Sequence, residues 1–301
     1  MASAHHQESE LEHTLPVGQV ATPCPHGRST GDTGKEDSML RSLKALDGFK
    51  IAATDGELGH VRDIYFDDQK WTVRYFEVDT GGWMSGRMVL LSTASVSGID
   101  WDDERLRVSL SRAQVENSPG LDSALPVSRQ HELALSRYYG TPHYWNGPFI
   151  WGYTAFPVLA DPIPWDPATD QLAATPVDEP AVEGDPHLRT KDEVVGYQIE
   201  ANDGGIGHLE DLLFNPRDWR VSLIVVATRD WLPGRHVLVP PGRIDAISWE
   251  EKSVRVDASR SDIENSVEYD TRHPPEADDV DLLVQRLDQG PRRDEGGGLR
   301  L

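Results

Sequence analysis

The segment "DGELGHVRDIYFDD", residues 55–68, decides how the rest of the chain is interpreted. It gathers one histidine and four aspartates in fourteen residues, a composition that would suit a metal site or an acid–base site. A similar segment, "DGGIGHLEDLLFNP", occupies residues 203–216. The chain therefore carries the segment twice. Comparing the two copies shows which residues recur and so helps to distinguish residues that the fold requires from residues that take part in a reaction or in binding.

The similarity between the two segments extends without a gap over residues 48–118 and 196–266, at a constant offset of 148. In this alignment 27 of 71 positions are identical. The recurring pairs include Gly59/Gly207, His60/His208, Asp63/Asp211, Trp83/Trp231 and Arg87/Arg235. An ungapped match of this length indicates a tandem duplication of a unit of about 75–80 residues.

The chain is acidic, with a formal net charge of −22, but the duplicated copies carry only −4 each. The remaining −14 lies in the tails and in the connector between the copies. This balance argues against nucleic-acid partners, because binding phosphate needs clustered Lys and Arg. It argues equally against docking on an anionic bilayer by charge.

Cys24 is the single cysteine, so one chain can form neither a disulfide nor a cysteine-based zinc site. No apolar run approaches the roughly 18 residues that a membrane span requires. The N-terminus shows no basic region followed by an apolar one, as a secretory signal would. We therefore expect a soluble, cytoplasmic protein with no transmembrane segment.

Each copy has the pattern of an all-β unit. "FKIAAT" (49–54) and "YQIEAN" (197–202) alternate in polarity and lead into Asp-Gly, a strong hairpin signal. "TVRYFEV" (72–78) and "RVSLIVV" (220–226) are rich in β-branched residues, which strands prefer. About six short strands in this length predict a small closed or nearly closed barrel. Ser111 with Gln114, and Ser259 with Asp262, predict capping boxes of short helices at the ends of the copies.

These features resemble the PRC-barrel family. The resemblance rests on the "DG-x-x-G-x-V/L-x-D" hairpin, the strand after a Trp, the strands "VLLS" (89–92) and "VLVP" (237–240), and the exits "ENSPGLD" and "ENSVEYD". Such barrels occur in the cytoplasmic domain of the photosynthetic reaction-centre H subunit, in a ribosome maturation factor and in stand-alone bacterial and archaeal proteins. In the first two, the resemblance implies a protein-docking module and not an enzyme.

The predicted architecture is mostly β, with two small PRC-like barrels in tandem. We expect a disordered tail over 1–38, a first barrel over 39–120, a connector over 121–188, a second barrel over 189–272, and a short helix and disordered tail over 273–301. The connector is rich in proline but holds eight aromatic residues between 138 and 156. It should therefore pack on the barrels, on a second copy of the chain or on a client. A short helix is expected at 131–140, stopped by Gly140.

His60 with Asp63, and His208 with Asp211, form a possible paired polar site. The alternative, which we favour, is that each histidine is a polar strand residue beside a glycine needed for curvature, because i and i+3 face opposite sides of a strand. Zinc would also need further ligands, and no such motif is present. We therefore expect no metal and no cofactor.

Arg87 and Arg235 recur together with Asp63 and Asp211, so each barrel is expected to hold a structural Asp–Arg pair. Trp83 and Trp231 precede the same turns and either cover one end of the barrel or contribute to a binding surface. Seven residues are candidates for binding a partner: Trp83, Arg87, Trp231, Arg235, Tyr144, Trp145 and Trp151.

The sequence therefore predicts a non-enzymatic docking or scaffold protein with no catalytic residues. Its partner is an unidentified protein or a second copy of the chain. One alternative is a small-ligand or metal-binding protein that uses the paired His/Asp positions. Another, from the family resemblance alone, is an H-subunit-like role in photosynthetic electron transfer.

Overall fold

The computed structural model describes residues 39–84, 86–121, 127–141, 143–157, 187–228 and 234–288. These residues form two sheets of seven strands, one for each copy. The expected tails over 1–38 and 291–301 lie outside the described residues. We call residues 39–139 the first half and residues 187–288 the second half, and from here on the connector is the segment between them. The two halves belong to one compact unit.

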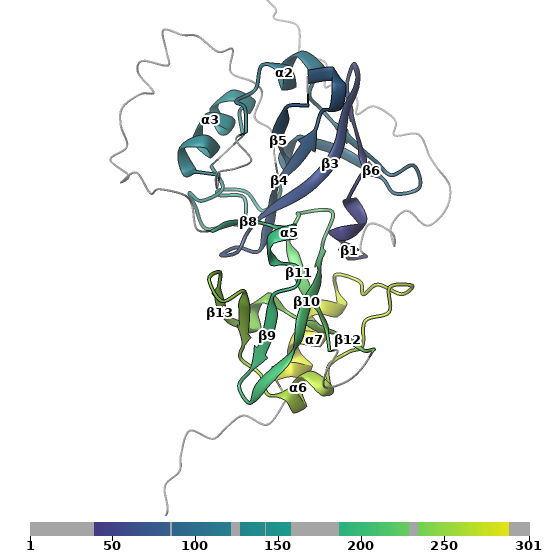
Figure 1. Ribbon diagram of the computed structural model, residues 1–301, viewed down its shortest axis with the longest axis vertical. Coiled ribbons are helices and arrows are strands. Elements are labelled where there is room, and N and C mark those ends of the chain that lie inside the picture. Colours follow the sequence, from purple (N-terminus) through teal and green to yellow (C-terminus); the bar gives the residue numbers. More distant parts are fainter. Residues whose placement is uncertain are drawn as a thin grey trace, which may run out of the picture. The chain divides into compact units, whose positions relative to one another are not determined.

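The first sheet has the order β5-β4-β3-β2-β7-β6. Its strands are β2 Lys50–Ala53, β3 Gly56–Asp67, β4 Thr72–Asp79, β5 Met88–Ser92, β6 Val96–Asp100 and β7 Arg105–Val108. Figure 1 labels β3, β4, β5 and β6 among these strands. The second sheet repeats this order with β9 Gln198–Ala201, β10 Gly204–Phe214, β11 Val221–Ala227, β12 His236–Val239, β13 Ile244–Ser248 and β14 Ser253–Val256. The barrels were expected to be closed or nearly closed. Among the described residues they are not fully closed, because the end strands β5 and β6 do not pair with each other, and neither do β12 and β13.

The seventh strand of each sheet is contributed by the segment that leads into the opposite half. β1 (Arg41–Ser42) precedes the first sheet but pairs with β10 of the second. β8 (Leu188–Thr190) precedes the second sheet but pairs with β3 of the first. We call these two segments the arms. Arg41 lies opposite Phe214 and Arg189 opposite Phe66, and both pairs are related by the 148-residue offset.

The halves also meet through a two-residue antiparallel contact between the starts of β4 and β11. Val73 N donates to Trp219 O at 2.9 Å, and Val221 N donates to Trp71 O at 2.7 Å. Thr72 and Arg220 lie between these bonds as a bridge pair. Because Thr72 and Arg220 occupy equivalent positions in the two copies, the halves are related by an approximate twofold axis through this point.

The recurring glycines Gly59 and Gly207 are fixed by close backbone approach. A Cβ on either residue would lie 2.0 Å from a carbonyl oxygen, that of Asp79 or of Ala227. Their φ angles of +144° and +147° are also unfavourable for other residues. The predicted curvature at Gly59 is present, since the pairing of β2 with β3 shifts register beside it.

A short helix follows the last strand of each half, and a longer helix comes later. α2 (Arg112–Glu116) and α6 (Arg260–Glu264) begin at Ser111 and Ser259, and both predicted capping boxes are present. The helix expected at 131–140 is α3 (Arg129–Tyr139), which ends at Gly140 with φ 68°. The helix expected near the C-terminus is α7 (Asp279–Asp288).

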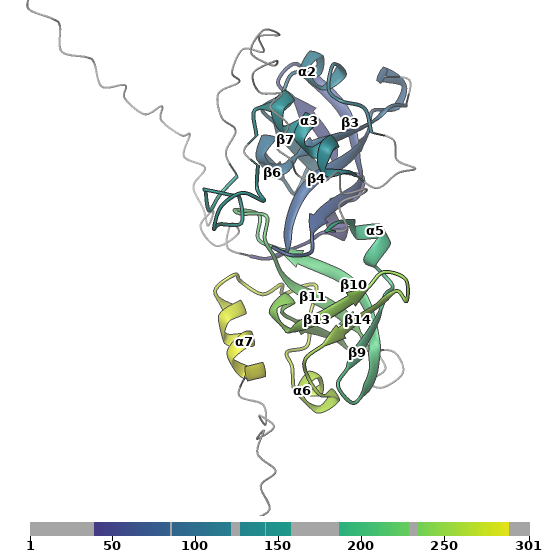
Figure 2. The same cartoon turned by 90° about the vertical axis from the view of Figure 1, so that its left-hand side faces the viewer.

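α3 and α7 show that the repeat extends beyond the region of recognisable identity. Shifted by 148 residues, α3 would cover 277–287, almost the span of α7. Leu135 and Leu283 are equivalent under this offset, and both are buried. Leu283 packs on the second sheet with Leu213, Leu223 and Leu238, and Figure 2 shows α7 beside that sheet.

Short helical segments complete the described structure. They are η1 (Lys44–Leu46), η2 (Gly81–Met84), η3 (Thr93–Ser95), α5 (Lys191–Val194) and η4 (Pro241–Arg243). No helix among the described residues is long and apolar enough to span a membrane.

Candidate functional site

The recurring aspartates Asp63 and Asp211 hold the two arms. Asp211 accepts hydrogen bonds from the Ser42 hydroxyl and from Lys44 N, the latter at 3.3 Å. Asp63 accepts from Asp192 N at 3.2 Å and from the Thr190 hydroxyl. Ser42/Thr190 and Lys44/Asp192 are equivalent pairs, so the same contact is made twice across the approximate axis. Each aspartate therefore joins one half to the arm of the other.

Burial raises the pKa of both aspartates, because desolvation disfavours the charged form. Hydrogen bonds from backbone N–H groups oppose this effect, including those from Ile64 and Leu212 at 2.7 Å each. These contacts explain why the aspartate of the repeated motif recurs. In both halves this aspartate joins the sheet to an arm.

The predicted Asp63–Arg87 pair is wrong. Arg87 instead donates to the carbonyl oxygens of Glu116, at 2.8 Å, and of Ser118. It therefore fixes the segment that follows α2. In the second half, the Nε of Arg235 lies 3.4 Å from a carboxylate oxygen of Glu268. Both arginines thus contact the exit of their own half, as an Arg side chain with several donors is suited to do.

The histidine–aspartate pairs are not brought together. His60 is exposed on β3, and its Nε2 lies 4.0 Å from a carboxylate oxygen of Asp79. The Nε2 of His208 lies 3.5 Å from Glu210. Asp63 and Asp211 face the arms instead. Across the described residues, no three His, Cys, Asp or Glu side chains gather in a way that could hold a metal ion.

The turns that carry the two candidate tryptophans are only partly described. Trp83 lies in η2, and its side chain is outside what the structure describes. Trp231 lies outside the described residues altogether. Their role as a cover or as a binding surface therefore stays a prediction.

The connector packs on its own halves through the predicted aromatics Tyr144, Trp145 and Trp151. The Tyr144 hydroxyl donates to Glu132 at 2.7 Å, and Lys70 Nζ donates to Tyr144 O at 2.7 Å. Trp151 donates from its indole N–H to Asp218 O at 2.8 Å. Tyr144 and Trp151 are buried, and Trp145 is half-buried against Arg129. The first of the three expected possibilities is therefore realised for these residues.

Arg74 lies at the centre of this packing and was not anticipated from the sequence. Its side chain is 1% exposed, and its Nη2 donates to Asp67 at 3.0 Å. The ring centroids of Tyr144 and Trp151 lie 3.7 and 4.8 Å from its guanidinium carbon. Stacking on aromatic faces offsets part of the desolvation of this cation. Because position 222 holds serine in the second copy, the repeat gave no signal for it.

The connector also presents an exposed aromatic tip, which we define as Phe149, Tyr153 and Phe156. Their exposed fractions are 52%, 77% and 60%. The loop is held by a bridge between Phe149 and Gly152, by another between Trp151 and Thr154, and by Lys70 Nζ donating to Phe149 O at 2.9 Å.

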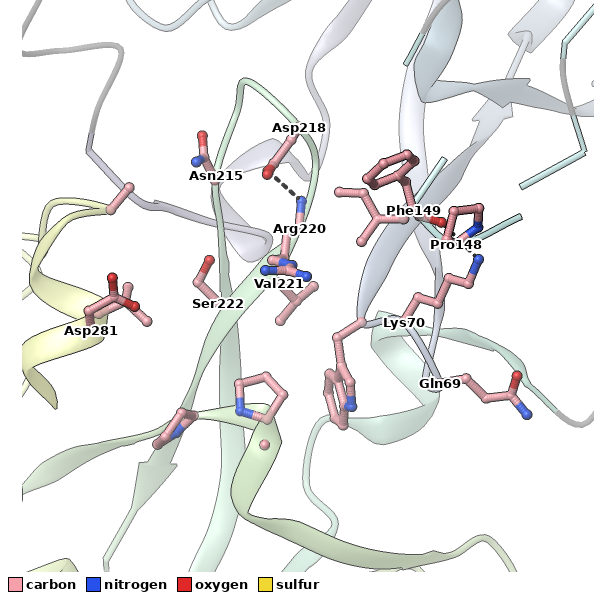
Figure 3. Close-up of a pocket in the computed structure, with 17 residues that line it drawn as sticks. Gln69, Lys70, Pro148, Phe149, Asn215, Asp218, Arg220, Val221, Ser222 and Asp281 are labelled. Carbon is pink, nitrogen blue, oxygen red and sulfur yellow. Dashed lines mark hydrogen bonds between the residues drawn. The ribbon is translucent and has the colours of Figure 1, made fainter. Parts of the chain in front are cut away.

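A pocket of about 630 Å³ opens beside the tip (Figure 3). Its walls come from the turn before β4, the connector, the start of β11, η4 and α7. Arg220 and Asp218 point toward its interior from one side, and Phe149 and Pro148 form the opposite wall. Burial raises the pKa of Asp218, whereas its hydrogen bond from Arg220 N, at 3.0 Å, opposes that shift. The volume lies within the range of small-molecule and side-chain binding sites.

Comparison with protein families identifies the first sheet. Residues 41–115 match the model of the PRC-barrel domain. The matched segment runs from β1 into α2. This segment is therefore similar to a PRC-barrel domain. The second half repeats the strand order, the close-packed glycine and the arm-binding aspartate of the first half, and so has the form of a second copy. A search of curated proteins found no match to the chain.

Asp68 gives a pH prediction for the PRC barrel. Desolvation raises its pKa to about 6, although His187, whose Nδ1 lies 3.3 Å away, opposes the shift. Well below the ordinary aspartate pKa of 3.8 the carboxyl is neutral in both states, whereas above pH 6 the folded state must bury its charge. Stability should therefore fall, by up to about 3 kcal/mol, as pH rises from 4 to 6.

Urea unfolding of the wild type and of Asp68→Asn at pH 4, 5, 6 and 7 measures this effect. The variant should show a smaller loss of unfolding free energy between pH 4 and 6. Asp55→Asn is the control, since Asp55 lies at an exposed turn and caps Arg112 N at 2.7 Å. Equal pH slopes for the wild type and Asp68→Asn would contradict the assignment.

Proposed function

We propose that the chain is a non-enzymatic protein-docking module, and that the aromatic tip is its contact surface. The observation that carries the proposal is the exposure of Phe149, Tyr153 and Phe156 on a loop whose base is buried. Aromatic residues contribute a large share of binding energy at protein interfaces. Three exposed aromatic rings within eight residues are more than scattered surface apolarity accounts for.

The fixed shape of the tip supports the same proposal. Trp151 is buried between two exposed aromatics, and Tyr144 anchors the loop at its start. A loop that is already ordered loses less conformational entropy on binding, so more of the contact energy appears as affinity. The loop is therefore suited to present its rings to a protein surface without rearrangement.

Capture of partners by the tagged full-length chain from its own host tests the proposal. A partner should be retained by the wild type and lost, by about tenfold or more, from Phe149→Ser/Tyr153→Ser/Phe156→Ser. Leu282→Ser is the control, because Leu282 is similarly exposed on α7, at 55%. Equal recovery with the triple variant would reject the tip. Loss on Trp83→Ala/Trp231→Ala instead would place the surface at the turns.

The two alternative functions have less support. A ligand or metal site formed by His60 with Asp63, or by His208 with Asp211, would need each pair to converge on one point, whereas both aspartates face the arms. A role like that of the reaction-centre H subunit rests on family resemblance alone.

A further inference from the structure

The pocket has an equivalent in the first half, related to it by the 148-residue offset. Its second-half lining includes Asn215, Ser222 and Val280. The corresponding residues of the first half are Asp67, Arg74 and Glu132. The approximate twofold axis through Thr72 and Arg220 therefore generates two related sites, one beneath α3 and one beneath α7.

The first of these sites is filled by the connector. Tyr144 stacks on Arg74 and donates to Glu132, while Trp151 also contacts Arg74 and donates to Asp218 O. These two rings are 5% and 4% exposed. The site of the first half thus binds two aromatic side chains of an irregular segment, those of Tyr144 and Trp151.

The second site lacks such an insertion by the described part of the chain. The connector touches it only from the side, through Pro148, Phe149 and Ile150, and leaves the cavity of about 630 Å³. Trp71 lies in its wall, equivalent to Trp219 in the first site. The same fold element that receives aromatic rings in one half is therefore present in the other, where none of the described residues inserts a ring into it.

The chemistry of the open site differs from that of the filled one in charge. Asp67, Arg74 and Glu132 are replaced by Asn215, Ser222 and Val280, so the buried ion network is absent. Val221, Pro240 and Pro241 add apolar surface. An uncharged aromatic ring fits such a wall without the cost of burying an ion pair.

Polar groups at the rim suit a polypeptide. In the first half, Lys70 Nζ donates to the backbone carbonyl of Tyr144. The equivalent residue at the open site is Asp218, whose carboxylate can accept a backbone N–H. In the first site the Trp151 indole N–H donates to the backbone carbonyl of Asp218. The equivalent group at the open site is the backbone carbonyl of Lys70, which can accept a hydrogen bond from an inserted tryptophan because a carbonyl oxygen has two lone pairs.

We propose that this pocket binds an extended segment of a protein partner by inserting its tyrosine or tryptophan side chain, as the connector does in the first half. The inference rests on the proposed docking function. It adds the kind of partner, an extended protein segment with a tyrosine or tryptophan, and the pocket that binds it. The tip adjoins the pocket through Phe149, so one partner segment can contact both.

A labelled peptide with the sequence of residues 143–152, "HYWNGPFIWG", is a suitable probe, because this sequence fits the equivalent site. Its fluorescence anisotropy is titrated with the full-length chain. The wild type should bind it saturably, and a peptide with alanine at both the Tyr144 and the Trp151 positions should not bind.

Two tryptophan substitutions form a matched pair. Gly242→Trp should fill the pocket and weaken probe binding by about tenfold or more. Gly205→Trp should leave binding unchanged, since Gly205 lies on β10 outside the lining. A Cβ added at either glycine meets no atom within 4 Å.

Several outcomes would overturn the proposal. One is no saturable binding to the wild type, and another is equal binding to Gly242→Trp. A third is a dimer of the wild type in sedimentation that Gly242→Trp abolishes, which would assign the pocket to a second copy. The probe measures the pocket alone. Loss of host partners on substituting the tip, with no probe binding, would therefore reject this inference while leaving the docking function in place.

Discussion

Gly59→Ala and Gly207→Ala should each destabilise the protein by about 3 kcal/mol or more. The added methyl group would lie 2.0 Å from the carbonyl oxygen of Asp79 or Ala227, and backbone atoms cannot yield as a flexible side chain can. The positive φ adds a further penalty. Since both positions are equivalent, the two losses should be similar in size.

Gly205→Ala is the matched control, two residues from Gly207 on the same strand. A Cβ there meets nothing within 4 Å. Its unfolding free energy in urea should change by less than about 0.5 kcal/mol. Comparable losses for Gly205→Ala and Gly207→Ala would mean that the cost comes from the strand and not from the close approach of β11.

Arg74→Ser should cost about 3–5 kcal/mol, because it leaves the buried Asp67 carboxylate without its partner and removes the group on which Tyr144 and Trp151 pack. Serine is the residue of the second half at this position, so the change introduces no foreign chemistry. The connector should also loosen, and limited proteolysis between residues 141 and 156 should become faster.

The second half supplies the compensating change for this test. Asp67→Asn reproduces Asn215, and the double variant Asp67→Asn/Arg74→Ser should recover part of the loss in urea unfolding. A double variant as unstable as the sum of the singles would show that the ion pair is not the main source of the effect. The lost aromatic packing would then account for it.

The repeat predicted the fold well because its recurring positions are framework positions. Asp55 and Asp203 each accept a backbone N–H at 2.7 Å from the arginine that opens the following short helix. The glycines of the hairpin turns and the capping serines contact residues close to them in the sequence. Their roles can therefore be predicted from sequence spacing. α7 matches α3 in position although little identity remains there, because packing conserves a face and not particular residues.

The contacts of Asp63 and Asp211 could not be predicted in the same way. A repeat shows that two positions are equivalent but not that each binds the arm of the other copy. The predicted partner, Arg87, recurred just as regularly and was wrong. Arg74 and Glu132 carried no repeat signal at all, because their network exists in only one half, where the connector requires it.

The exchanged arms have a consequence for the order in which the protein can be made. β8 completes the first sheet along Tyr65–Asp67, yet it is synthesised only after the connector. β1 is the first strand to be synthesised, but its site on Leu213–Phe214 is made only with β10, after the whole first sheet and β8. A nascent chain emerging from the ribosome must therefore hold an unpaired strand edge and an unplaced arm until most of its length has been translated. We expect fragments that stop before residue 188 to be captured by chaperones or to associate with one another through that edge.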